Sequence, residues 1–214
     1  MKRITLTICS AILFFSCNDS TKTEDKKAAN DSTVTKVEEK APPPAPPMDS
    51  AAMMKAWQAY MTPGQVHAML AKSNGKWDEQ VTMYNPGGTT TKGSSIAVNT
   101  MVLGGRYQQS HHTGTMMGMP FEGMGTVGYD NMKKVFQSSW VDNMGTGVSF
   151  MEGPWDSATH TITLKGKMMD PMSGKDQDMR QTFTMVDDNN QKMEMFATQN
   201  GKETKMMEIA LKRK

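Results

Sequence analysis

The pattern of apolar and polar residues divides the chain into a helical part and a strand-forming part. In residues 53–61 apolar side chains recur every three or four positions, which predicts a short amphipathic helix with Asp49 as its N-cap. A second short helix is predicted from Thr62, as its cap, to about Asn74. We expect both helices to pack on the domain that follows, although the stripe of the first helix could instead bind a partner.

After Gly75 the period of the pattern changes to two, and short segments rich in Thr, Val, Ile, Met and aromatic residues are separated by turn residues. Ile162 and Leu164 alternate with threonines, and Asn200-Gly201 is a strong hairpin signal. So many antiparallel strands must protect their edges, and closure into a barrel does so. The predicted fold class is all-β: an antiparallel β-barrel of eight to ten strands preceded by two short α-helices, with a β-sandwich as the alternative.

Residues 1–16 have the pattern of a secretory signal peptide, in which two basic residues precede an apolar stretch. The ending Phe14-Phe15-Ser16-Cys17 resembles the bacterial lipobox, whose cysteine is acylated and becomes the first residue of the mature protein. Cys17 is therefore the predicted lipidation site and attaches the protein to a membrane, with an ordinary cleaved signal as the alternative. Because Asn18 rather than an aspartate follows, we expect a cell-envelope lipoprotein of the outer membrane, on its periplasmic face or its surface.

The remainder divides into two further parts. Residues 17–48 are predicted to be the lipidated cysteine and a disordered, Pro-rich tether, because they contain almost nothing that could be buried. Residues 49–214 are predicted to hold the helical lead-in and the barrel.

Composition excludes several classes of function. The 24 Lys and Arg residues nearly balance the 22 Asp and Glu residues, and loss of Lys2 and Arg3 with the signal peptide would leave a formally neutral chain, so nucleic acid is not an expected partner. The only cysteines are Cys9, within the signal, and Cys17. No disulfide and no catalytic thiol are therefore expected.

Four motifs resemble a bacterial family of unknown function, number 1579, over roughly Met53 to Arg213. They are Gly75-Lys76-Trp77, Leu103-Gly104-Gly105-Arg106-Tyr107, the glycine-rich block from Pro120 to Asp130, and Trp140-Val141-Asp142. The resemblance implies a calycin-like barrel, similar to lipocalins and fatty-acid-binding proteins, and almost nothing about activity. Calycins typically pack a first-strand Trp beneath a basic side chain near the chain's end, so we expect Arg213 to lie over Trp77.

The candidate site residues lie in the predicted strands. Arg106 could pair with Glu122 or Asp142 inside the barrel, either as a structural ion network or as one that orients a ligand. Trp140 and Phe136 share a phase and are expected to line the interior. Asp130 follows Tyr129 at a turn, where an aspartate commonly accepts hydrogen bonds from its own backbone.

Glycines 123, 125 and 128 do not form a phosphate loop, because their flanks are strand-like and no helix follows. Glycine in a strand more often marks a close approach of the backbone.

Imidazole and thioether groups together can bind Cu(I), and His111 and His112 lie just before several methionines: Met116, Met117, Met119 and Met124. With 24 methionines spread over every segment, adaptable core filling is the preferred interpretation, so no metal and no cofactor are assigned.

The predicted function is therefore that of a lipid-anchored envelope protein that binds a small apolar or amphiphilic molecule inside a barrel. The residues expected to contact the ligand are Arg106, His112, Glu122, Trp140 and Asp142. No catalytic residue is assigned, but an envelope enzyme that uses Glu122 or Asp142 with His112 is one alternative. A protein-interaction module without a pocket is the other.

Overall fold

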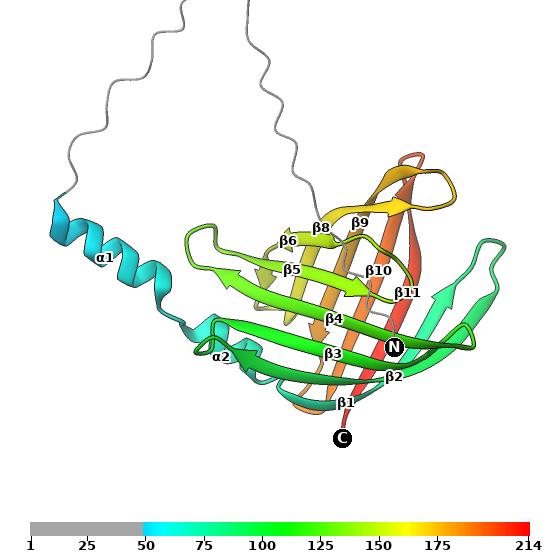
Figure 1. Ribbon diagram of the computed structural model, residues 1–214, viewed down its shortest axis with the longest axis horizontal. Coiled ribbons are helices and arrows are strands. Elements are labelled where there is room, and N and C mark those ends of the chain that lie inside the picture. Colours follow the sequence, from blue (N-terminus) through cyan, green and yellow to red (C-terminus); the bar gives the residue numbers. More distant parts are fainter. Residues whose placement is uncertain (1–48) are drawn as a thin grey trace, which may run out of the picture. The chain divides into compact units, whose positions relative to one another are not determined.

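The computed structural model describes residues 49–214, so the predicted signal peptide, Cys17 and the tether lie outside the described residues. Within 49–214, two helices precede eleven strands (Figure 1). The helices are α1 (Ser50–Met61) and α2 (Gln65–Ala71). The strands are β1 (Gly75–Tyr84), β2 (Thr90–Val102), β3 (Tyr107–Met116), β4 (Met119–Asp130), β5 (Val135–Asp142), β6 (Ser149–Gly153), β7 (Trp155–Asp156), β8 (Thr161–Asp170), β9 (Lys175–Met185), β10 (Asn190–Gln199) and β11 (Lys202–Arg213).

Ten of these strands form a closed antiparallel barrel. Neighbouring strands follow the order β6-β5-β4-β3-β2-β1-β11-β10-β9-β8, and the pairing of β6 with β8 closes the sheet. The two-residue strand β7 pairs only with β8. The turn at Asn200-Gly201 joins β10 to β11 with positive φ at both residues, as its sequence predicts. The structure confirms the predicted barrel and not the sandwich.

One end of the barrel is closed by α2 and filled with apolar side chains. Leu70 of α2 packs with three buried residues of β5 and β8: Phe136, Ile162 and Leu164. Gln108 of β3 donates a hydrogen bond from Nε2 to the Leu70 carbonyl (3.0 Å). The carbonyl of Ser73, just after α2, accepts from Trp77 Nε1 and Asn99 Nδ2. We call this the closed end of the barrel.

Arg213 lies over Trp77 at the closed end, as expected. The two residues are directly paired across β1 and β11, and the guanidinium carbon lies 4.3 Å from the centroid of the fully buried Trp77 ring. The same guanidinium donates to the carbonyls of Asn74 (2.7 Å), Lys72 (2.6 Å) and Asp188 (2.8 Å). Arg213 therefore joins the segment after α2 to the last strand and stabilises the closure.

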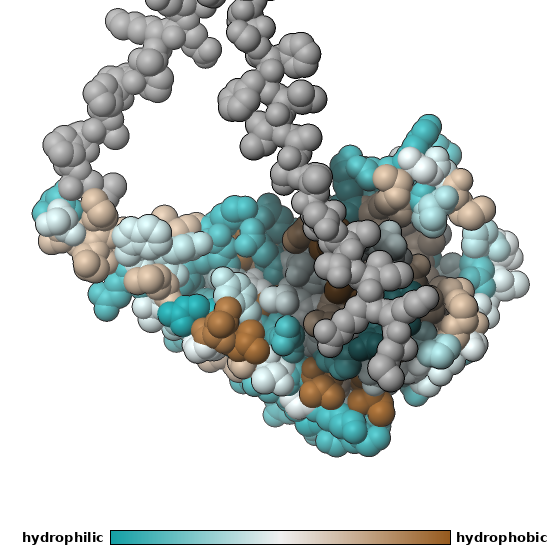
Figure 2. Space-filling view, viewed as in Figure 1, coloured by the Kyte–Doolittle hydropathy of each residue, from teal (hydrophilic) through white to brown (hydrophobic). Residues whose placement is uncertain are grey.

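The expectation that both helices pack on the barrel is correct for α2 and wrong for α1. Every residue of α1 is exposed, including its apolar stripe, and tan, moderately hydrophobic residues lie on its surface in Figure 2.

Thr62 ends α1 instead of starting α2, because its hydroxyl donates to the Gln58 carbonyl (2.6 Å). Gly64 is the N-cap of α2, and its N–H donates to His67 Nδ1 (3.0 Å).

Asn131, in the turn between β4 and β5, holds the end of α1. Its Nδ2 lies within hydrogen-bond distance of the carbonyls of Ala59, Tyr60 and Thr62. The barrel thus contacts the last turn of α1 through backbone groups, while the stripe faces solvent.

In residues 49–214 neither helix has the length and apolar character that crossing a bilayer requires.

Candidate functional site

On β5 and β8 the inward-facing side chains are buried at the closed end and become more accessible with distance from it. On β5, Phe136 is fully buried, whereas the next inward-facing residues, Ser138, Trp140 and Asp142, are half-buried. On β8 the exposed fraction rises from 3% at Ile162 to 41% at Met168. We call the accessible region the open half of the barrel, and the candidate site lies along its wall.

A buried carboxylate marks the wall formed by β1, β2 and β3. Glu79 is only 2% exposed, and its Oε2 accepts a hydrogen bond from Ser95 Oγ (2.5 Å) and lies 3.0 Å from Nδ1 of His112. Glu79 pairs directly with Ser95 across β1 and β2, so the strand register brings these side chains together. A buried carboxylate is costly unless it has such partners.

Trp140 of β5 lies beside this group, against the backbone of β4. A β-carbon at Gly123 or Gly125 would collide with the benzene ring of Trp140 or come unusually close to it. The His112 ring meets the indole edge-on, with a centroid distance of 5.0 Å, and Phe121 stacks near it at 6.4 Å. The glycines of β4 thus leave the space that the indole occupies, which is the close backbone approach that the sequence predicts.

Asp142 fixes the direction of the indole. Its Oδ2 accepts a hydrogen bond from Trp140 Nε1 (2.7 Å), and its Oδ1 accepts from the backbone N–H of Met144 (2.9 Å). Asp142 therefore connects the Trp140 ring to the turn after β5. A side chain held in this way is preorganised to contact a ligand.

The wall formed by β10 and β11 has the opposite character. In the order of the ten strands, β10 lies across the barrel from β4. Two inward-facing residue pairs of β10 and β11 are half-buried and apolar: Met193 with Ile209, and Met195 with Met207. The open half therefore has a polar and aromatic wall facing a flexible apolar one, as small-molecule sites often do.

Three of the five predicted ligand contacts lie together in this site: His112, Trp140 and Asp142. The other two lie outside the barrel. Glu122 faces solvent and its Oε1 lies 2.9 Å from Nε2 of His111, while Arg106 donates from Nη1 to the Leu103 carbonyl (3.0 Å) in the turn before β3. Among the described residues Arg106 forms no ion pair with Glu122 or Asp142.

The alternation of side chains along the strands explains the position of Glu122, whereas Arg106 belongs to the turn between β2 and β3. On β4, Phe121 and Gly123 face inward, so Glu122 between them must face outward. For the same reason Glu122 and His112 lie on opposite faces of the sheet and cannot act together on one substrate.

Two residues of the site, Glu79 and Ser95, do not appear among the predicted contacts. A signal for Glu79 exists, because it has the same phase as Trp77 and Val81, which face inward on β1. Ser95 carries no signal of its own in the sequence, since its role depends on its register with β1.

The residues considered for copper do not converge. His111 and His112 point to opposite faces of β3, toward Glu122 and Glu79 respectively. Met116 pairs with Met119 at the end of the β3–β4 hairpin, and Met117 lies in the turn. In residues 49–214 no group of three or more His, Cys, Asp and Glu side chains is placed to hold a metal ion.

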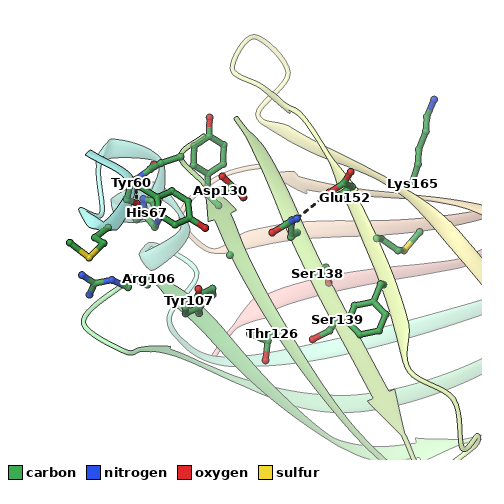
Figure 3. Close-up of a pocket in the computed structure, with 17 residues that line it drawn as sticks. Tyr60, His67, Arg106, Tyr107, Thr126, Asp130, Ser138, Ser139, Glu152 and Lys165 are labelled. Atoms are coloured by element: carbon green, nitrogen blue, oxygen red, sulfur yellow. Dashed lines mark hydrogen bonds between the residues drawn. The ribbon is translucent and has the colours of Figure 1, made fainter. Parts of the chain in front are cut away.

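A hollow lies on the outside of the barrel (Figure 3). It has a volume of about 610 Å³ and is bounded by the last residues of α1 and by outward-facing side chains of β3, β4, β5, β6 and β8. Tyr60 and Arg106 stand at one side of it, and Lys165 stands at the other. We call it the outer groove.

Comparison with known proteins supports the fold and leaves the activity open. A family model described as protein of unknown function (DUF1579) matches residues 62–213. The crystal structure of Rv2717c from M. tuberculosis is similar, with a TM-score of 0.55 and 11% sequence identity over 72% of this chain and 99% of that chain. No curated protein matches the sequence.

Proposed function

This chain belongs to DUF1579, a family of proteins of unknown function, and we propose that it is a lipid-anchored envelope protein whose barrel binds a small apolar or amphiphilic molecule. The observation that carries the proposal is the contrast between the two walls of the open half. The polar group of an amphiphile would lie near His112 and Trp140, and its apolar part would pack against the methionines of β10 and β11.

The rigidity of one wall and the adaptability of the other support binding of this kind. Trp140 is held by Asp142 and by the glycines beneath it, while Met193, Met195 and Met207 can change rotamer around an apolar group. The carboxylate of Glu79 is already paired with Ser95 and His112, so a neutral or weakly polar head group is favoured over an anion.

The envelope location rests on the sequence of residues 1–48. The charged and apolar start, the lipobox-like ending at Cys17 and the Pro-rich stretch after it are typical of a lipoprotein that carries a domain on a tether. Asn18 after the cysteine favours the outer membrane.

Extraction of the purified full chain, followed by mass spectrometry of the extract, tests the binding proposal. We expect the same molecule in independent preparations, and its loss from a Trp140→Ala variant but not from Met124→Ala, which changes the outer face of β4. If repeated preparations hold no molecule and no apolar fluorescent probe binds inside the barrel, the binding proposal is wrong.

The anchor is tested separately by the mass of the N-terminal peptide and by fractionation of a Cys17→Ser variant. An acylated Cys17 and release of the variant from membranes would support it. An unmodified cysteine would contradict the anchor and leave the binding proposal in place.

One observation favours catalysis as a second candidate function. Glu79 contacts His112 Nδ1, an arrangement that fixes the imidazole and leaves Nε2 as the nitrogen for a substrate. Turnover of a metabolite library by the wild type, abolished in His112→Gln, would support an enzyme. Retention of an unchanged ligand would support a carrier.

A further inference from the structure

The floor of the outer groove is built from two parallel rows of side chains. Strand pairing places Tyr107, Gly128, Gln137, Glu152 and Lys165 in one row across β3, β4, β5, β6 and β8. The adjacent row contains Thr126, Ser139 and Phe150. With neighbouring strands about 4.8 Å apart, a row of five strands spans roughly 19 Å. The floor is therefore long enough for an extended ligand.

Aromatic side chains stand at both ends of this floor. The Tyr107 ring lies on the sheet over Gly128, where a β-carbon would approach the ring to 2.6 Å. Tyr107 is still 42% exposed and Phe150 is 68% exposed, so each ring presents a surface to solvent. Tyr60, from the end of α1, contributes a third aromatic ring to the side of the groove (Figure 3).

Between the aromatic rings the floor is polar and without a dominant charge. Thr126 and Ser139 are directly paired and present hydroxyl groups. Gln137 donates from Nε2 to Glu152 (3.1 Å), which also accepts from Lys133 (3.1 Å). These contacts lower the pKa of Glu152, so the carboxylate stays ionised and compensated. The groove is lined by two basic residues, Arg106 and Lys165, and two acidic ones, Asp130 and Glu152, so it does not select an ion of one sign.

The closed sheet limits how a ligand can be recognised here. Each of the five strands is hydrogen-bonded on both sides, so a peptide cannot add as an extra strand. An acyl chain would leave the hydroxyl and amide groups of the floor without partners. A ligand with apolar faces can pack on the aromatic rings, and its hydroxyl groups can bond to the polar groups of the floor. Such a ligand matches both kinds of surface in the groove.

We propose that the outer groove binds a neutral oligosaccharide of about four pyranose rings, given the roughly 19 Å floor. The sugar rings stack on Tyr107 and Phe150, and their hydroxyl groups exchange hydrogen bonds with Thr126, Ser139 and Gln137. This site is separate from the barrel interior, because its floor is the outward face of the strands. It does not depend on the proposed interior ligand.

The test measures binding of maltotetraose, cellotetraose and the tetramer of N-acetylglucosamine to the full chain by saturation-transfer NMR. The protein is held in a detergent without a sugar head group. We compare the wild type with Phe150→Ala, whose exposed ring can be removed without opening the core, and with Met124→Ala as a control on the same outer face.

We expect saturable binding of at least one tetrasaccharide, an affinity lowered about tenfold or more in Phe150→Ala, and no change in Met124→Ala. Circular dichroism of each variant checks that the fold is retained. Absence of binding to all three sugars would overturn the proposal, as would wild-type affinity in Phe150→Ala. Binding of an extended Gly-Ser-Thr octapeptide without any sugar binding would assign the groove to peptides, and would also overturn it.

Discussion

The benzene ring of Trp140 occupies the space that a side chain at Gly123 would need. This contact joins β5 to β4 inside the barrel and places the indole beside His112. It also gives a physical reason for the glycine-rich block in β4. The glycines do not loosen the strand, because the aromatic ring fills the space above them.

Replacement Gly123→Ala should therefore disturb both stability and the site. The added methyl group collides with Trp140, and overpacking of this kind costs about 1–3 kcal/mol. Urea unfolding measures the stability, and the NMR signal of the Trp140 Nε1–H group reports on the site. Gly145→Ala is the control, because a β-carbon there meets nothing within 4 Å. Equal stability of the two variants would show that the indole does not need this space.

The neighbouring residues His111 and His112 each pair with a glutamate, one pair exposed and one buried. The effect of burial on the stability contribution of such a pair can therefore be compared directly. Glu79 with His112 is inside the barrel, and Glu122 with His111 is outside it, with Glu122 63% exposed. We expect Glu79→Ala to cost about 3 kcal/mol, because it removes one partner of a buried pair. Glu122→Ala should cost less than about 1 kcal/mol, because its pair is solvated. Chemical unfolding measures both, and similar losses would contradict the assignment of Glu79 to the interior.

Replacement Arg213→Lys keeps the charge but removes the planar group that stacks on Trp77. A lysine cannot reproduce the three hydrogen bonds to the carbonyls of Lys72, Asn74 and Asp188. We expect a loss of about 2 kcal/mol in the free energy of unfolding. Hydrogen exchange should show faster opening of Trp77 and of the segment after α2. Lys212→Arg, at the neighbouring outward position of β11, should leave both measurements unchanged.

His67 should make stability depend on pH. Burial lowers its pKa from the ordinary 6.5, the nearby Arg106 acts in the same direction, and the hydrogen bond to the Tyr129 backbone opposes them. Because the unfolded chain then binds a proton more readily than the folded one, stability from this residue is present above pH 6.5 and is lost as the pH falls below it.

Protonation also removes the acceptor that His67 Nδ1 offers to Gly64. The measurement is the free energy of unfolding between about pH 7.5 and 5.5 for the wild type and His67→Asn. The wild type should lose more stability on acidification than the variant. Parallel curves would mean that His67 does not contribute.

The fold could be predicted where the residue pattern of a short segment allows only one local conformation and one buried face. Ile162 and Leu164 alternate with polar neighbours, and both are buried in the barrel. Asp130 accepts from the backbone N–H groups of Met132 and Lys133, as an aspartate at a turn is expected to do. For α1 the same kind of reasoning failed, because periodicity identifies an apolar face but not what covers it.

The candidate site could be predicted only in part for a related reason. Trp140 and Asp142 share an inward phase on one strand, so their proximity to the interior is readable from the sequence. Glu122 and His112 lie on different strands, and which face each presents depends on strand phase and pairing. A shift of one residue reverses the face, which is why Glu122 is outside and Glu79 takes the place beside His112.

By itself, the sequence determined the antiparallel barrel and its hairpins, because alternation and turn residues act over a few neighbouring positions. The stacking of Arg213 on Trp77 was predicted from the family motifs. Only the tertiary structure decided which carboxylate meets His112, that Trp140 rests on glycines, and that an outer groove exists. These features arise from the register between strands and from the closure of β6 on β8. They depend on contacts between distant residues, and no single segment encodes them.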